Sequence, residues 1–183
     1  MITAGASGAL LLACAALVGR DDEVLMPDPS YPCNRQFVQA ADGRAVLLPC
    51  SASQRFQLCA DQVLEHWGPQ TRGVLLASPS NPTGTSMASD ELARVHEVVS
   101  QRGGFTLVDE IYLGLSFDKA YGQSALTHSE DIISINSFSK YFNMTGWRLG
   151  WMVVPERLVD VIERLTQNAF CEKSRFSVSV CTG

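Results

Sequence analysis

A single lysine stands among aromatic and small residues in the segment Ser137–Arg148, directly after a run of apolar residues. A lysine in an apolar setting loses hydration, which lowers the pKa of its ammonium group and makes the amine a usable nucleophile toward an aldehyde. Lys140 is therefore the first candidate for covalent chemistry. The alternative is a surface lysine that packs its aliphatic stem on the protein and keeps its charge in water.

A carboxylate and a phenol lie three residues apart in Leu107–Tyr112, where another apolar run ends. A carboxylate at such a place is often only a helix cap. Asp109 gains a functional meaning if a cationic ring nitrogen needs a counter-ion, because a partly desolvated carboxylate stabilises that charge more than one in water does. Tyr112 would then stand beside the same ligand.

Two loops of small and rigid residues complete the polar set. The turn Gly5–Ala9 opens a predicted helix, so its unpaired N–H groups and the positive helix end suit a phosphate. It lacks the lysine of a Walker loop and the full dinucleotide fingerprint. The loop Ser78–Gly84 contains two prolines, which would fix the direction of Asn81. Each loop also has a structural interpretation, as a closely packed turn.

Short apolar runs alternate with longer stretches of helical periodicity, which predicts an α/β fold with a mostly parallel sheet and helices on both faces. Such sheets place ligand sites beyond the carboxyl ends of their strands, where the polar clusters lie. We predict that Ser89 caps the fourth helix. The predicted strands are Glu23–Met26, Ala45–Leu48, Gly73–Ala77, Phe105–Asp109, Ile132–Asn136 and Leu149–Val154, and the predicted helices are Ser7–Val18, Tyr31–Ala41, Ala60–Trp67, Ser89–Arg102 and Pro155–Ala169.

The polar clusters carry a family resemblance. Asn-Pro-Thr-Gly at Asn81–Gly84, Asp-Glu-x-Tyr at Asp109–Tyr112, and Ser-x-Ser-Lys followed by Gly-Trp-Arg-Leu-Gly at Ser137–Gly150 stand in the order and separation found in one family. From about Ile2 to Ala169, the chain resembles the large domain of the class I/II aminotransferases of pyridoxal-phosphate (PLP) fold type I. The resemblance therefore implies PLP as the cofactor.

The resemblance assigns a role to each motif residue. Lys140 would hold PLP as a Schiff base and later carry the proton between the substrate Cα and the cofactor as general base and acid. Asp109 would pair with the pyridinium nitrogen. Asn81 and Tyr112 would bind the ring phenolate oxygen, and Tyr31 would stack on the ring. Lys140, Asp109 and Tyr112 are the catalytic candidates.

The cofactor phosphate would be held at the start of the first helix and in the lysine loop. Four residues are implied: Ala6, Ser7, Ser137 and Arg148. Arg148 would contribute a planar, charge-assisted fork that a lysine could not reproduce. The bonds Asp28–Pro29 and Asn81–Pro82 match positions where relatives have cis peptides.

The resemblance implies an aminotransferase that moves an amino group from an amino acid to a 2-oxo acid. Two alternatives stay open. The same cofactor site serves lyases, such as a C–S lyase, and fold alone does not separate them from transferases. The chain could also be an inactive truncated fragment that binds PLP weakly or not at all.

Both ends of the sequence are abrupt. We expect residues 1–170 to form an incomplete PLP-binding large domain and residues 171–183 to be an unassigned tail, with the small C-terminal domain of the family absent. The full-length parent is expected to be a homodimer, because family active sites lie at a dimer interface.

Composition argues against several other functions. The net charge is −5, and lysines and arginines are scattered singly, so neither nucleic acid nor a membrane is expected as a partner. The six cysteines lack the paired spacing of a zinc or redox site, so no metal is expected. Free thiols in apolar runs, such as Cys14 and Cys50, favour a cytoplasmic protein.

Overall fold

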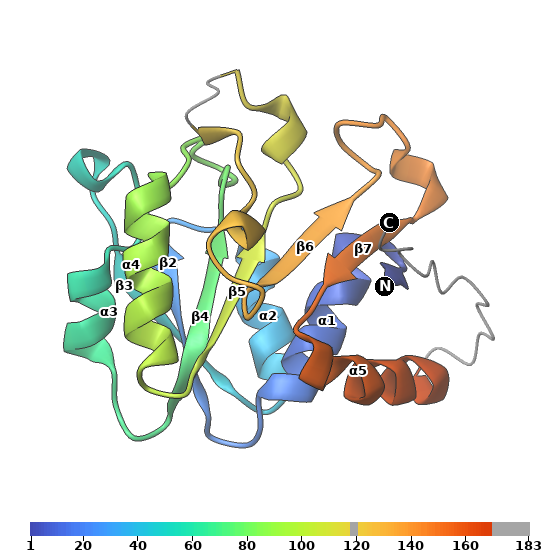
Figure 1. Ribbon diagram of the computed structural model, residues 1–183, viewed down its shortest axis with the longest axis horizontal. Helices are drawn as coiled ribbons and strands as arrows, with labels where there is room; N and C mark the ends of the chain where they lie inside the picture. Colours follow the sequence, from blue (N-terminus) through green and yellow to red (C-terminus); the bar gives the residue numbers. More distant parts are fainter. Residues whose placement is uncertain (118–120, 170–183) are drawn as a thin grey trace.

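The computed structural model describes residues 1–117 and 121–169. Within these residues, seven strands form one sheet with helices packed on both sides (Figure 1). The strands are β1 (Ile2–Thr3), β2 (Glu23–Asp28), β3 (Arg44–Pro49), β4 (Thr71–Ala77), β5 (Phe105–Asp109), β6 (Ile133–Ser137) and β7 (Gly150–Val153). The helices are α1 (Gly5–Leu17), α2 (Pro32–Ala40), α3 (Ala60–His66), α4 (Ser89–Ser100) and α5 (Glu156–Ala169).

The sheet is mostly parallel, as the sequence predicts. Its order is β1-β7-β6-β5-β4-β2-β3, and the strands from β6 to β3 run parallel, whereas β7 and β1 are antiparallel to their neighbours. Asp109 pairs with Ala77 on one side and Ile135 on the other. The carboxyl ends of β4, β5 and β6 therefore lie level at one edge of the sheet.

Two hydrophobic cores cover the two faces of the sheet. The first core joins the sheet to α1, α2 and α5, and the second joins it to α3 and α4 (Figure 1). Successive strand residues point to opposite faces, so Leu75 belongs to the first core and its neighbours Val74 and Leu76 to the second. The first core also contains Cys14, and burial raises the pKa of that thiol to about 12.

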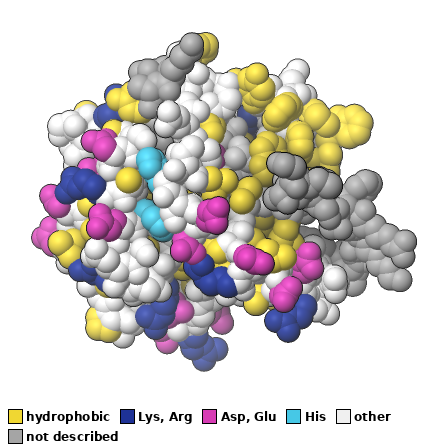
Figure 2. Space-filling view, viewed as in Figure 1, with side chains coloured by type: hydrophobic (Ala, Val, Ile, Leu, Met, Phe, Trp, Pro, Cys, Tyr) yellow, Lys and Arg dark blue, Asp and Glu magenta, His cyan; other side chains and the backbone are white. Residues whose placement is uncertain are grey.

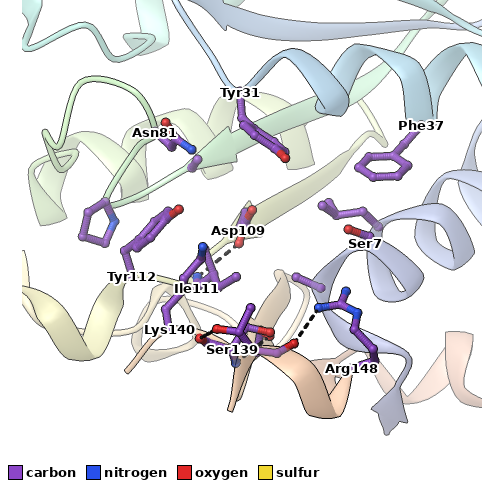
Figure 3. A pocket seen from close by; sticks show the side chains of 16 residues that line it. Ser7, Tyr31, Phe37, Asn81, Asp109, Ile111, Tyr112, Ser139, Lys140 and Arg148 are labelled. Carbon is purple, nitrogen blue, oxygen red and sulfur yellow. Dashed lines mark hydrogen bonds between the residues drawn. The ribbon is translucent and has the colours of Figure 1, made fainter. Parts of the chain in front are cut away.

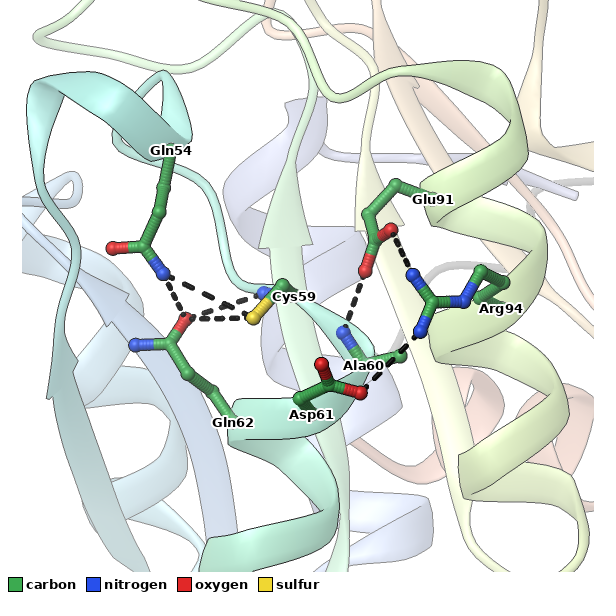
Figure 4. Close-up of polar contacts among 7 residues, drawn as sticks. All are labelled: Gln54, Cys59, Ala60, Asp61, Gln62, Glu91 and Arg94. Atoms are coloured by element: carbon green, nitrogen blue, oxygen red, sulfur yellow. Dashed lines mark hydrogen bonds and ion pairs between the residues drawn. The ribbon is translucent and has the colours of Figure 1, made fainter.

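Polar contacts tie α3 to α4 (Figure 4). The Ala60 N–H at the start of α3 donates to Glu91 at 2.7 Å, and Arg94 pairs with both Glu91 and Asp61. The backbone N–H at a helix start has no partner within its own helix, so a carboxylate from the next helix satisfies it.

The predicted elements are all present, with ends that differ by at most two residues. One local prediction is wrong: Ala88, not Ser89, is the N-cap of α4. The Ser89 hydroxyl instead forms a hydrogen bond with Nε2 of His128 at 3.0 Å, so a contact distant in sequence competes with the local capping role.

The predicted cis bonds Asp28–Pro29 and Asn81–Pro82 are confirmed, and Ser78–Pro79 is also cis. None of the helices that the structure describes is long and apolar enough to cross a membrane. The predicted tail, 171–183, lies outside the described residues.

Candidate functional site

A cavity of about 350 Å³ opens at the carboxyl ends of β4, β5 and β6, next to the first turns of α1 and α2 (Figure 3). All nine residues predicted to bind the cofactor line it: Ala6, Ser7, Tyr31, Asn81, Asp109, Tyr112, Ser137, Lys140 and Arg148. Seven further residues were not predicted: Leu10, Phe37, Ala77, Pro79, Ile111, Ser139 and Thr145. The fold therefore brings the four polar clusters of the sequence to one place.

Asp109 ends β5 at the floor of the cavity, with only 8% of its surface exposed. Its Oδ1 accepts a hydrogen bond from the Ile111 N–H at 3.1 Å. Burial raises the pKa of Asp109 to about 6; the Ile111 N–H opposes the rise and the Glu110 carboxylate adds to it. Because one hydrogen bond offsets only part of the cost of burying its charge, this carboxylate is suited to a cationic partner in the cavity.

Tyr31 and Tyr112 present their rings to the cavity from two sides (Figure 3). Tyr31 is the N-cap residue of α2, where an extended backbone and Pro32 at the first helical position set the direction of the side chain. A hydrogen bond with the Cys33 side chain raises the pKa of Tyr31, together with the Cys33 charge and burial. The aromatic rings make this part of the cavity suitable for a flat ligand.

Asn81 reaches the cavity from the loop after β4, and a buried glutamine holds that loop in place. Nε2 of Gln57 donates to the carbonyls of Ala77 at 3.1 Å and Thr85 at 2.9 Å. The Ser80 N–H donates to the same Thr85 carbonyl at 2.9 Å. Gln57 was missed in the sequence because its partners lie 20 and 28 residues away.

The opposite end of the cavity is built for an anion. Gly5 begins α1 with φ of +75°, and a Cβ on it would lie 2.7 Å from Nη2 of Arg148. Only glycine lets the guanidinium approach the start of the helix so closely. Ser7 of the first turn lines the cavity there, so helix N–H groups and a cationic fork face one space.

The loop that follows β6 carries Lys140 and is fixed by hydroxyl groups. The Ser137 hydroxyl accepts from the Ser139 N–H at 3.0 Å and contacts the Ser139 hydroxyl at 2.9 Å and the Leu149 carbonyl at 3.1 Å. Thr145 Oγ1 donates to the Ser139 carbonyl at 2.7 Å. The main chain on either side of Lys140 is therefore held by side chains of its own loop.

Lys140 points into the cavity, with Nζ 5.7 Å from the centre of the Tyr112 ring (Figure 3). The expectation that this lysine is desolvated is wrong for the described chain, because its side chain is exposed. The loop after β6 stands at the mouth of the cavity, where water reaches the amine.

Glu110 is a buried carboxylate that faces away from the cavity, on the side of the second core. It is 2% exposed and accepts hydrogen bonds from the Ser134 hydroxyl at 2.5 Å, the Ser124 hydroxyl at 2.9 Å and the Ala125 N–H at 2.6 Å. Sequence reasoning missed this role. Glu110 ties β5 to the following segment and thereby supports the position of Asp109.

The arrangement combines a buried carboxylate, an amine and an anion-binding helix start in one cavity. Such a site can hold a flat molecule with a cationic nitrogen at one end and an anionic group at the other, and can present an amine to its carbonyl carbon. Among the described residues, no group of three or more histidine, cysteine or acidic side chains is placed to hold a metal ion.

Comparisons with known proteins agree with this geometry. The valine–pyruvate aminotransferase of Mycobacterium tuberculosis is 42% identical over 169 residues, which cover 92% of this chain and 43% of that protein. A probable N-acetyl-LL-diaminopimelate aminotransferase of Bacillus subtilis is 34% identical over 175 residues, covering 95% and 44% of the two chains. A crystal structure of an aminotransferase from M. tuberculosis superposes with a TM-score of 0.86 at 42% identity, over 92% of this chain and 43% of that one.

The chain thus spans less than half the length of the curated relatives that it matches. The solved aminotransferase structure superposes on this mixed, mostly parallel sheet with flanking helices, which is the fold expected for the large domain of fold type I. Residues 1–181 match the family described as aminotransferase class I and II. The chain belongs to the class I and II aminotransferase family.

Proposed function

We propose that this chain is the cofactor-binding part of a PLP-dependent aminotransferase, which moves an amino group from an amino acid to a 2-oxo acid. The observation that carries the proposal is the single cavity that gathers Asp109, Lys140 and Arg148. A buried carboxylate, an amine and a guanidinium are the three groups needed to bind a pyridinium, an aldehyde and a phosphate.

The residues present fit PLP. The cavity of about 350 Å³ is within the range of small-molecule sites. Gly5 leaves a space against Arg148 that a Cβ would fill, and the Asp109 carboxylate accepts a hydrogen bond from the Ile111 N–H and has room for a charged partner. A cationic ring nitrogen at Asp109 would favour the ionised carboxylate, so binding should lower the raised pKa of that group.

Each end of the cavity would hold one part of the cofactor. Asp109 would keep the ring nitrogen protonated, Asn81 and Tyr112 would bind the phenolate oxygen, and Tyr31 would stack on the ring. Four residues would hold the phosphate: Ala6, Ser7, Ser137 and Arg148. When bound, PLP supplies an aldehyde for the amino group and a ring that withdraws electrons.

Lys140 would act twice. Its amine would hold the aldehyde carbon of the cofactor, and after displacement by the substrate amine it would move a proton to and from the substrate Cα as general base and acid. Exposure of Lys140 in the described chain means that another part of the protein must exclude water during this step.

Residues 1–170 would form the PLP-binding part of a large domain. We propose a homodimer for the full-length parent, supported by exposed aromatic side chains in the lysine loop: Tyr141 is 56%, Phe142 48% and Trp147 70% exposed. Figure 2 shows hydrophobic side chains gathered on one side of the molecule. The four described cysteines are free thiols, which fits a cytoplasmic location.

The test is an absorption titration of the chain with PLP, followed by borohydride reduction and peptide mapping. The sequence contains lysine only at positions 119, 140 and 173. We expect an absorbance band of the bound imine and reduction onto Lys140, with both lost in Lys140→Ala and kept in Lys119→Ala and Lys173→Ala. An unchanged band in Lys140→Ala would overturn the assignment.

A second measurement separates transfer from elimination. The PLP-loaded chain is mixed with an amino acid that carries a leaving group on Cβ, and pyridoxamine phosphate, pyruvate and ammonia are measured. A transferase yields pyridoxamine phosphate without pyruvate or ammonia from elimination. Release of both products would favour a lyase, and a PLP-loaded chain that yields none of the three would favour the inactive fragment.

A further inference from the structure

Thr145 lies in the loop between Lys140 and Arg148, the two cationic residues of the cavity. It contacts the main chain next to Lys140 and the side chain of Arg148. Its hydroxyl donates to the carbonyl of Ser139, the residue before Lys140, at 2.7 Å. Its own carbonyl accepts from Nη1 of Arg148 at 3.2 Å. Thr145 also lines the cavity itself. Thr145 therefore contacts both the main chain beside Lys140 and the guanidinium of Arg148.

The backbone between Thr145 and Arg148 is a single turn, which keeps the two residues close together. Thr145 begins a single 3-10 turn, η5 (Thr145–Trp147), and Arg148 ends that turn in the left-handed conformation with φ of 53°. Non-glycine residues seldom adopt that conformation, so the turn fixes where the Arg148 side chain starts. Arg148 forms no ion pair with any described carboxylate, and its guanidinium donates a hydrogen bond to the Thr145 carbonyl.

We propose that Thr145 is a positioning residue that sets the separation between the Lys140 amine and the Arg148 guanidinium, and thereby the preference for an aldehyde that carries a phosphate. The inference rests on the proposed function, because it assumes that Lys140 captures the aldehyde and Arg148 the phosphate of one molecule. It adds a residue that the family motifs do not mark.

The physical basis is the gain from linking two binding groups. A molecule with both groups binds more tightly than the two separate pieces only when the protein holds its two contact points at the matching distance. Loss of the Thr145 hydroxyl frees the Ser139 carbonyl and lets the Lys140 main chain move relative to Arg148. Binding of each separate piece depends on one contact point and should change little.

The experiment compares PLP, pyridoxal and inorganic phosphate as probes of the 183-residue chain. Imine absorbance gives the apparent dissociation constants of PLP and pyridoxal, and competition against PLP gives that of phosphate. Thr145→Val keeps the shape and removes the hydroxyl, whereas Thr145→Ser keeps the hydroxyl. A lost hydrogen bond corresponds to roughly a three- to tenfold change, so we expect the preference for PLP over pyridoxal to fall by about that factor in Thr145→Val.

The expected result also includes an unchanged PLP preference in Thr145→Ser and nearly unchanged constants for pyridoxal and phosphate in Thr145→Val. A merely structural role would weaken PLP and pyridoxal equally. Equal weakening, or a full PLP preference in a folded Thr145→Val chain, would overturn the inference while leaving the proposed function intact.

Two controls keep the test decisive. Circular dichroism shows whether Thr145→Val folds, and if it does not, Thr145→Ala, which also lacks the hydroxyl but adds no bulk, takes its place with the same criteria. If the wild-type chain forms no reducible adduct with either aldehyde at Lys140, the proposed function and this inference both fail, which distinguishes that outcome from failure of Thr145 alone.

Discussion

Two adjacent carboxylates at the end of β5 face opposite sides of the sheet and differ in the number of hydrogen bonds that they accept. Asp109 faces the cavity, accepts one backbone hydrogen bond, and has a pKa raised to about 6 by burial. Glu110 faces the second core and accepts three hydrogen bonds from Ser124, Ala125 and Ser134. Both are buried, with 8% and 2% of their surfaces exposed.

Acidic residues therefore serve ligand binding on one face of the sheet and stability on the other. A buried carboxylate whose donors are all supplied by the protein holds the fold together. One left with a single donor destabilises the free chain and gains a partner only when a cation binds. Substitutions at each carboxylate test this contrast separately.

The largest effect is expected for Glu110→Ala. It leaves two hydroxyls and one N–H without their acceptor and opens a cavity, which should lower the free energy of unfolding by about 3–4 kcal/mol. Urea unfolding measures this loss. Glu97→Ala, at an exposed position of α4, is the control and should change stability by about 0.5 kcal/mol or less. Similar small losses in both variants would show that Glu110 has no special role.

Asp109→Asn should raise the free energy of unfolding, whereas Glu110→Ala lowers it. The raised pKa means that the folded chain binds this proton more tightly than the unfolded chain, whose carboxyl keeps its ordinary pKa of 3.8. Stability of the PLP-free chain therefore falls as pH rises from about 4 to about 6 and stays reduced above. Removing the charge should recover up to about 3 kcal/mol at pH 7.

The measurement is urea unfolding of the PLP-free chain between pH 4 and pH 7.5. The wild type should lose stability over this interval relative to Asp109→Asn, whereas Asp160→Asn, at an exposed position of α5, should follow the wild type. If the stability of wild type and Asp109→Asn changed with pH in the same way, Asp109 would not differ from Glu110 in the way proposed. The same Asn variant should bind PLP more weakly, because the ring nitrogen loses its counter-ion.

Gly150→Ala tests the close packing of β7 against the start of α1, which forms one end of the cavity. A Cβ at Gly150 would lie 2.6 Å from the Gly5 carbonyl carbon and 2.8 Å from the Ala6 nitrogen, which are backbone atoms that cannot swing away. We expect a loss of about 2 kcal/mol in unfolding free energy. Gly146→Ala meets no atom within 4 Å and should be nearly neutral. Equal melting temperatures for the two variants would contradict the close approach of β7 to α1.

The smallest effect is expected for Ser134→Ala, which removes one of the three donors to Glu110. The loss should be about 1 kcal/mol, since two donors stay in place. Ser100→Ala, at the exposed end of α4, is the matched control. If Ser134→Ala were as costly as Glu110→Ala, one contact rather than the full set would stabilise the carboxylate.

Much of this arrangement could be predicted from the sequence because its signals are local. Apolar runs followed by turn residues marked the strands, and in a parallel sheet their carboxyl ends meet at one edge. The nine binding residues that the family resemblance implied line one cavity at this edge. Their roles toward PLP stay predictions, whereas the fold and the family are established.

The rest could not be predicted because it depends on contacts between distant segments. Gln57 belongs to none of the motifs, and the Asp-Glu-x-Tyr motif that contains Glu110 does not tell whether its glutamate is a buried anchor or a surface residue. Ser89 matched a capping pattern, but His128 competes for its hydroxyl. The exposure of Lys140 depends on what covers the mouth of the cavity, which no local pattern states.

The cavity draws its walls from the start of α1, the loops after β4 and β5, and the turn before β7, so it exists only when these segments are packed together. A ligand of this cavity therefore selects the folded chain, and at a hundred times its dissociation constant it would add about 2.7 kcal/mol to the stability. A rise of the melting temperature with cofactor concentration would therefore show that the cofactor binds the folded chain in preference to the unfolded one.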